Sequence, residues 1–163
     1  MKKMLLRFAI VFSVVAIIIS IVAGVKSFQF TNGCYSYLRL AGNAPTVERA
    51  EKFLKKVVTY IDKNNLDIGN SSFLIFRPTN DLDNWSGQMR AAYKIVADLS
   101  EQTDVSQLTK DNALMKIREV VGYVPDNIAY YPYQVFMIFF LAIFWILAIV
   151  FWIWLGILAM IPY

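Results

Sequence analysis

The chain has 163 residues, of which 58% are hydrophobic and 15% aromatic, and it carries a net charge of +4 without any histidine. The absence of histidine excludes His-ligated haem, most zinc and non-haem iron sites, and catalysis of the Ser-His-Asp or Cys-His type. With Cys34 as the single cysteine, an internal disulfide is also excluded. The hydrophobic excess is too large for an average soluble domain, and it is concentrated at the two ends of the chain.

The first apolar segment, residues 8–25, follows a short basic start at residues 1–7. It carries no charge, and as a helix it spans about 27 Å, which is enough for one membrane pass. A secretory signal peptide is the competing interpretation, but its apolar core usually has only about 7–15 residues, so we expect an uncleaved transmembrane helix. Because Lys2, Lys3 and Arg7 precede the segment, the positive-inside rule predicts a cytoplasmic N-terminus.

Residues 26–134 have an ordinary composition and are predicted to form one small extracytoplasmic domain of about three helices. Apolar side chains at spacings of three and four indicate amphipathic helices over Thr46–Lys63, with Thr46 as N-cap, and over Asn80–Glu101, with Asn80 as N-cap. The segment Asp104–Val121 opens like a capping box, but its apolar stripe is broken at Lys110–Asn112, which suggests two short helices. The charges of this region nearly balance, so the sequence gives no sign of nucleic-acid binding.

Three segments connect these helices to each other and to the membrane. Residues 26–45 are expected to leave the membrane, with room for a short helix at Tyr35–Leu40. Leu66–Arg77 is the one strand-like stretch, and because one strand cannot form a sheet, we expect an extended connection tucked against the helices. Before the last apolar segment, three tyrosines are predicted to form an interfacial belt: Tyr130, Tyr131 and Tyr133.

The second apolar segment, residues 135–161, contains no charge and no proline. As a helix it is roughly 40 Å long, about 10 Å more than a bilayer core needs, so it should tilt or continue above the membrane, leaving 162–163 as the cytoplasmic end. Its many aromatic side chains have three interpretations: exposure to lipid, packing against another membrane protein, or contact with a flat hydrophobic cofactor such as a carotenoid or quinone. Those expected to pack against lipid or a partner are Phe136, Phe140, Phe144, Trp145, Phe151, Trp152 and Trp154.

No residues suited to catalysis, cofactor binding or metal binding can be assigned. Asp81 and Asp83 lie where helix capping explains them, and no phosphate-binding glycine loop occurs. Within the two apolar segments, Ser13 and Ser20 are the only polar residues apart from the indole N–H groups. Transport and ion conduction require more polar groups at membrane depth, so neither is expected.

These features predict an all-α membrane protein: two transmembrane helices flank a small extracytoplasmic helical domain, both termini are cytoplasmic, and the location is a bacterial inner membrane. The expected partners are the lipid bilayer and a larger membrane-protein complex. We therefore expect a non-catalytic accessory or structural subunit of such a complex, without a cofactor. The alternative is an extracytoplasmic ligand-sensing module that signals through a partner's membrane helices, because the predicted cytoplasmic segments, 1–7 and 162–163, are too short to hold an output domain.

Overall fold

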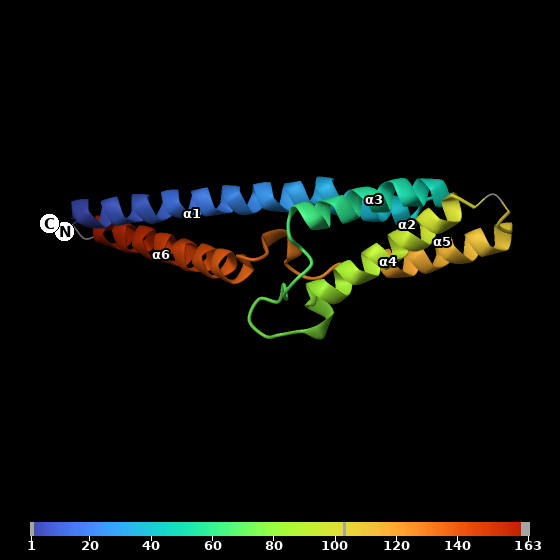
Figure 1. Ribbon diagram of the computed structural model, residues 1–163. Helices are drawn as coiled ribbons and strands as arrows, with labels where there is room; N and C mark the ends of the chain where they lie inside the picture. Colours follow the sequence, from blue (N-terminus) through green and yellow to red (C-terminus); the bar gives the residue numbers. More distant parts are fainter. Residues whose placement is uncertain (1, 103, 161–163) are drawn as a thin grey trace.

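The computed structural model describes residues 2–102 and 104–160, and these residues form an all-helical structure (Figure 1). Within them, β structure is limited to one isolated bridge between Asn70 and Asp81, so the prediction of an all-α protein is confirmed. Three short turns join the α-helices: the π-helical η1 (Thr31–Tyr35) and the 3-10 turns η2 (Pro78–Asn80) and η3 (Ile128–Tyr130). The α-helices are α1 (Lys2–Phe30), α2 (Ser36–Gly42), α3 (Val47–Lys63), α4 (Leu82–Ser100), α5 (Gln107–Val121) and α6 (Gln134–Met160).

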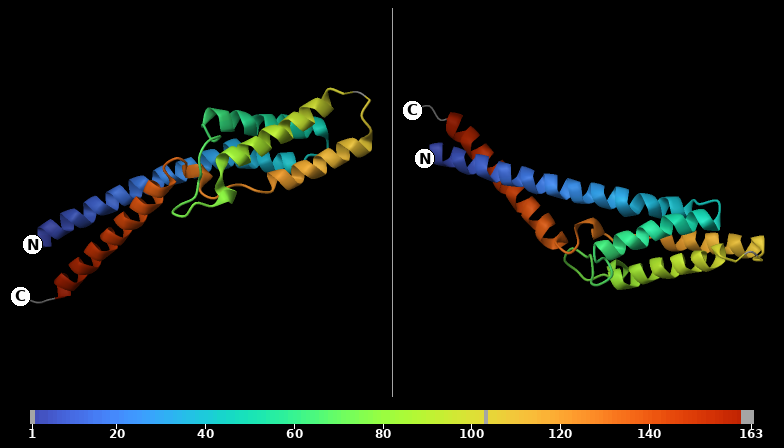
Figure 2. Two further views of the ribbon diagram at one scale, coloured as in Figure 1. Left: turned by 60° about the horizontal axis from the view of Figure 1, so that its bottom comes forward. Right: turned by 45° about the horizontal axis from the view of Figure 1, so that its top comes forward.

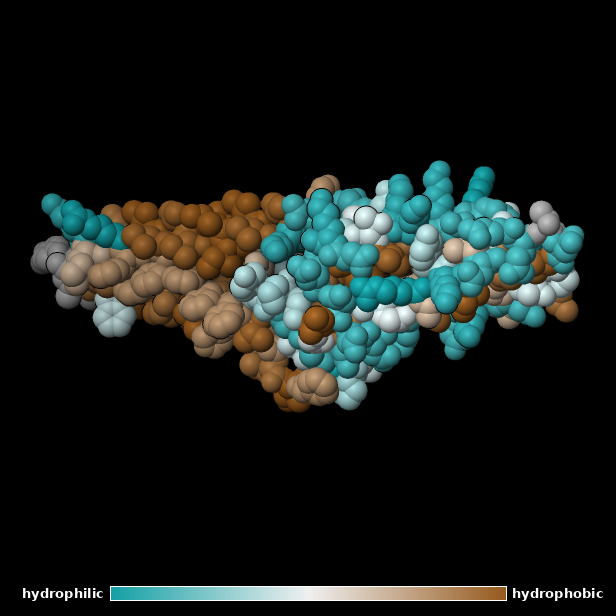
Figure 3. Space-filling view, viewed as in Figure 1, coloured by the Kyte–Doolittle hydropathy of each residue, from teal (hydrophilic) through white to brown (hydrophobic). Residues whose placement is uncertain are grey.

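The molecule is elongated and has two parts (Figures 1 and 2). At one end α1 and α6 lie against each other as an antiparallel pair, and at the other end α2, α3, α4 and α5 pack into a bundle. The space-filling view shows the same division chemically, because the helix pair is brown with apolar residues and the bundle is mostly polar (Figure 3). Ile161, predicted to end the second membrane helix, and the predicted end segment 162–163 lie outside the described residues, as does Met1 of the predicted start.

The first long helix does not stop where the apolar segment ends. α1, η1 and α2 follow one another without a break, so the chain is helical from the N-terminal apolar segment into the interior of the bundle. Phe30, Cys34 and Leu38 are buried in the bundle core along this extension. Only a short helix at Tyr35–Leu40 was expected from the sequence here, whereas the structure has a continuous helix that contains a π-turn.

The π-turn coincides with a close contact between two helices. Gly33 lies against the ring of Tyr60 on α3, so closely that a Cβ at position 33 would be 2.5 Å from Cε2 of that ring. The Tyr60 ring also meets Phe30 edge-on, with ring centroids 6.1 Å apart. A glycine in η1 therefore allows α3 to pack directly on the long helix.

The predicted amphipathic faces form the core of the bundle. On α3 the stripe that begins at Val47 and ends at Ile61 is buried, and Thr46 caps the helix by accepting a hydrogen bond from Arg49 N–H at 3.4 Å. On α4 the predicted packing face is also buried, from Leu82 through Met89 to Val96. Both predicted helices, with their inward faces, are confirmed.

Two helix caps and the continuity of one helix were predicted wrongly. The N-cap of α4 is Asp81, whose carboxylate accepts from Asp83 N–H at 3.0 Å, whereas Asn80 is buried and its Oδ1 accepts from Asp126 N–H in the loop after α5. The third amphipathic segment is one continuous helix, α5, and its cap is Ser106 instead of Asp104. The polar break at Lys110–Asn112 lies on the solvent side of α5, so it does not interrupt the helix.

The strand-like segment Leu66–Arg77 is not tucked against the helices along its whole length. Leu66 and Ser71 are buried, but the apolar tip turns outward, with Leu74, Ile75 and Phe76 exposing 75%, 76% and 68% of their surface. The expectation of a fully packed connection is therefore wrong for the tip. Hydrogen bonds at the base of this loop, described below, hold the tip away from the bundle.

Candidate functional site

The pairing of α1 with α6 is the most extensive contact between any two elements of the described chain. The contact is close because small residues lie at its centre: Ala9 and Ala16 on α1 are completely buried, and Ala148 on α6 is 2% exposed. Small side chains let two helix backbones approach, and van der Waals packing is the main attraction between helices in an apolar environment. The two helices thus form a defined hairpin interface.

A ladder of phenylalanine rings runs across this interface. Phe136, Phe140 and Phe144 stack along α6 at centroid distances of 6.4 and 6.2 Å. The ladder then crosses to α1, where Phe12 lies 5.9 Å from Phe144. It ends where Phe151 meets Phe12 at 5.5 Å and Phe8 at 5.9 Å. Offset aromatic pairs at such distances add stability beyond the area they bury, so the ladder fixes how the two helices face each other.

Two hydrogen bonds also join the helices. The Trp145 indole N–H donates to Ser20 Oγ at 3.3 Å, and the Trp152 indole N–H donates to Ser13 Oγ at 3.1 Å. Ser20 also donates to the Ala16 carbonyl of its own helix at 2.8 Å. The two serines are the polar residues noted in the sequence of the first segment, and each is matched to a tryptophan. Without these bonds, each indole N–H would lack a partner in an apolar surrounding.

The seven aromatic residues predicted to pack against lipid or a partner are therefore divided between two faces. Phe144 and Phe151 lie in the contact with α1 and are half-buried. Phe136, Phe140, Trp145, Trp152 and Trp154 retain 42–64% of their surface exposed, even though the indole N–H groups of Trp145 and Trp152 bond to α1. Contact of this outer face with lipid, a partner or a cofactor remains a prediction. Phe8 and Phe12 were not predicted to take part, although their spacing of four residues places both rings on one face of a helix.

Both long helices have the length and composition of membrane spans. Each contains an 18-residue window of mean hydropathy 2.9, and only 11% of that window in the first helix and 6% in the second is buried. The core helix of a soluble protein would be mostly buried. The hairpin instead leaves most of its large apolar side chains exposed, and Figure 3 shows one face of this brown surface.

Polar contacts fix the start of α6 to the bundle. Gln134, which the sequence analysis did not single out, is 5% exposed, and its Nε2 donates to the carbonyls of Asn70 at 3.1 Å and Ser72 at 3.5 Å. Tyr131 donates its hydroxyl to the Ile68 carbonyl at 2.8 Å and packs on the bundle core. Of the other two residues of the predicted interfacial belt, Tyr133 is exposed and Tyr130 is partly buried in η3. Their contact with a membrane interface remains a prediction.

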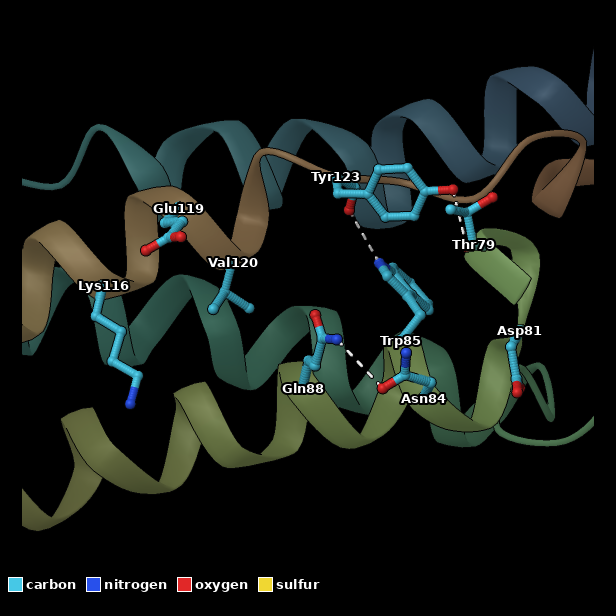
Figure 4. A pocket seen from close by; sticks show the side chains of 9 residues that line it. All are labelled: Thr79, Asp81, Asn84, Trp85, Gln88, Lys116, Glu119, Val120 and Tyr123. Carbon is cyan, nitrogen blue, oxygen red and sulfur yellow. Dashed lines mark hydrogen bonds between the residues drawn. The ribbon is translucent and has the colours of Figure 1, made fainter. Parts of the chain in front are cut away.

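A separate cavity of about 470 Å³, with apolar and polar side chains in its lining, opens between α4 and α5 (Figure 4). Trp85 forms its floor and donates its indole N–H to the Tyr123 carbonyl at 3.2 Å, while the Tyr123 hydroxyl donates to the Thr79 carbonyl at 2.8 Å. Lys116 and Glu119 extend from α5 at its rim. This lining of mixed charge and amide groups could hold a small polar molecule by hydrogen bonds.

The bundle interior also contains the single thiol. Burial raises the pKa of Cys34 to about 12, so the thiol is protonated and shielded at neutral pH. Among the described residues, no three His, Cys, Asp or Glu side chains converge in a way that could hold a metal ion.

A comparison of the chain with protein-family models, curated protein sequences and solved structures finds no match.

Proposed function

We propose that this chain is an integral membrane protein whose helices α1 and α6 cross the bilayer as a hairpin and hold the bundle at one membrane surface. The large exposed apolar surface of the hairpin supports this, because a soluble monomer rarely exposes a continuous apolar patch of more than a few hundred Å². By the positive-inside rule, the basic residues before the first span put both ends of the hairpin in the cytoplasm. In a bacterial inner membrane the bundle would then face the periplasm.

We further propose that the protein is a non-catalytic accessory subunit of a larger membrane complex. The observation that carries this proposal is the outer aromatic face of α6, whose large side chains stay 42–64% exposed although α1 packs beside them. Large rigid aromatic side chains are enriched where proteins meet partners. The bundle is firmly connected to the hairpin, so docking of α6 would also fix the position of the bundle on the complex.

Gentle solubilisation followed by affinity purification tests this proposal. We expect stoichiometric recovery of one larger complex, and loss of that complex when Phe136→Leu and Trp154→Leu reduce the outer face of α6. Ile153→Leu is the matched control, because Ile153 is equally exposed next to Trp154 and the change keeps its size. A monodisperse chain recovered without partners from native membranes would contradict the accessory role.

The second candidate is a ligand-sensing module that signals through a partner's membrane helices. Two observations favour it: the cavity lined by Trp85 and Tyr123, and the unbroken helix that leads from the bundle into the hairpin. A ligand that stabilises the bundle would raise its melting temperature, and Gln88→Ala at the cavity wall would remove that effect. If no small polar metabolite raises the melting temperature while a complex co-purifies, the sensing role is wrong and the accessory role is retained.

A further inference from the structure

The loop between α3 and α4 has an apolar tip that the bundle does not cover. Leu74, Ile75 and Phe76 are each more than two-thirds exposed and are consecutive in sequence. Isolated exposed apolar residues are common, but three adjacent large ones on a bundle that is otherwise polar indicate a contact surface. The described hairpin and bundle leave this tip open, so it is free to contact a surface outside the chain.

The base of the loop is rigid and polar. Asn70 Oδ1 accepts from Ser72 N–H at 2.9 Å, and Asn70 Nδ2 donates to the Arg77 carbonyl at 2.8 Å. Ser72 Oγ accepts from Arg77 N–H at 3.0 Å and from Asn80 Nδ2 at 3.3 Å. These bonds close the loop across its neck, so the apolar tip is held outward by a defined structure.

The same neck is bound to the first turn of α6. Gln134 donates to the carbonyls of Asn70 and Ser72, and Arg77 forms an ion pair with Asp126 at 3.5 Å, just ahead of α6. In Figures 1 and 2 the loop lies beside the start of α6, at the same level along the hairpin, and in Figure 3 its brown tip continues the apolar surface of the hairpin. The tip is therefore at the height where α6 would enter a bilayer.

We propose that Leu74, Ile75 and Phe76 insert into the bilayer leaflet on the bundle side, beside the point where α6 enters. This inference rests on the proposed membrane hairpin. The apolar tip would be placed among the outer acyl carbons, and the hydrogen-bonded neck with Arg77 would stay at the level of the polar headgroups. The loop then acts as a third membrane contact, which sets the tilt of the bundle relative to the hairpin.

Single-cysteine labelling of the full chain in nitroxide-lipid vesicles tests this inference. Ile75→Cys receives an environment-sensitive fluorophore, and the buried Cys34 needs no replacement because it does not compete for the label. We expect blue-shifted emission that is quenched by nitroxide lipid and protected from aqueous iodide. Leu108→Cys on α5 is the control, because Leu108 is equally exposed (71%) but lies on the bundle, and its label should behave as in water.

A third label separates the two proposals. Ile153→Cys, on the exposed face of α6, reports the hairpin itself. If nitroxide lipid quenches the label at 153 but iodide quenches the label at 75, the hairpin stands and the loop insertion is wrong. If iodide quenches both labels, the membrane hairpin is wrong as well. A label at 75 that is protected from both quenchers only in the native complex would show a protein partner at the tip and overturn lipid insertion.

Discussion

Leu38 and Leu40 form a matched pair that tests whether the long helix is an integral part of the bundle. Both lie on α2, but Leu38 is 0% exposed in the core and Leu40 is 46% exposed on the surface. Leu38→Ala removes three carbons, which costs about 2.5 kcal/mol of transfer free energy. The cavity left behind brings the expected loss of unfolding free energy to about 3 kcal/mol. Leu40→Ala should change it by less than about 0.5 kcal/mol.

Thermal unfolding of the full chain in mild detergent measures this difference. For a domain of this size a loss of 1 kcal/mol lowers the melting temperature by about 4–8 °C, so Leu38→Ala should lower it by roughly 12 °C or more. In a common background with Trp145, Trp152 and Trp154 replaced by Phe, Trp85 is the single tryptophan, so its fluorescence follows the bundle separately from the hairpin. Equal melting temperatures for the two variants would refute the packing of α2 in the bundle, and with it the rigid connection to the hairpin.

Three further outcomes follow from the packing. Gly69→Ala should destabilise the chain by about 1–2 kcal/mol, because φ at Gly69 is +98°. Gly87→Ala should stabilise it by about 0.5–1 kcal/mol, because Gly87 lies within α4 with open space beside it. Equal effects of the two changes in urea unfolding would refute these backbone conformations. Cys34 should resist maleimide until denaturant unfolds the bundle, and rapid labelling of the folded chain would contradict its burial. A double-mutant cycle of Trp152→Phe and Ser13→Ala should give a coupling of about 0.6 kcal/mol in detergent unfolding, and a coupling of zero would exclude their hydrogen bond.

The sequence predicted the parts of the fold that depend on local patterns. Two amphipathic helices, α3 and α4, were recognisable because their apolar residues recur with the period of a helix, and the cap at Thr46 is set by adjacent residues. The two apolar helices were recognisable by length and absence of charge. These features need no information about distant parts of the chain.

The features that the sequence did not reveal all depend on distant contacts. The helix that begins with α1 continues into the bundle because α3 and α5 cover the residues after Phe30. No sequence pattern within residues 26–42 indicates that these distant helices pack there. Asn80 looked like a helix cap, but a loop from beyond α5 places Asp126 N–H within 3.1 Å of its Oδ1, and Asp81 caps instead. The pairing of Trp152 with Ser13 likewise joins residues from opposite ends of the chain.

The candidate site followed the same rule. The aromatic composition of the last helix was evident from the sequence, but its division into an inner face against α1 and an outer exposed face requires the crossing of two helices. The segment that carries the apolar loop tip, Leu66–Arg77, was recognised as strand-like and was wrongly expected to be tucked against the helices along its length. Its outward orientation is set by the hydrogen bonds of Asn70 and Ser72 and by their contact with Gln134, more than sixty residues later in the chain.

The most direct test of the membrane hairpin is the sidedness of three introduced cysteines in sealed, oriented membrane vesicles. Met4→Cys and Met160→Cys mark the free ends of α1 and α6, and Leu108→Cys marks the bundle; all three positions are exposed. A membrane-impermeant maleimide should label positions 4 and 160 from one side only and position 108 from the other side only. Labelling of positions 4 and 108 from the same side would contradict a hairpin with two membrane spans.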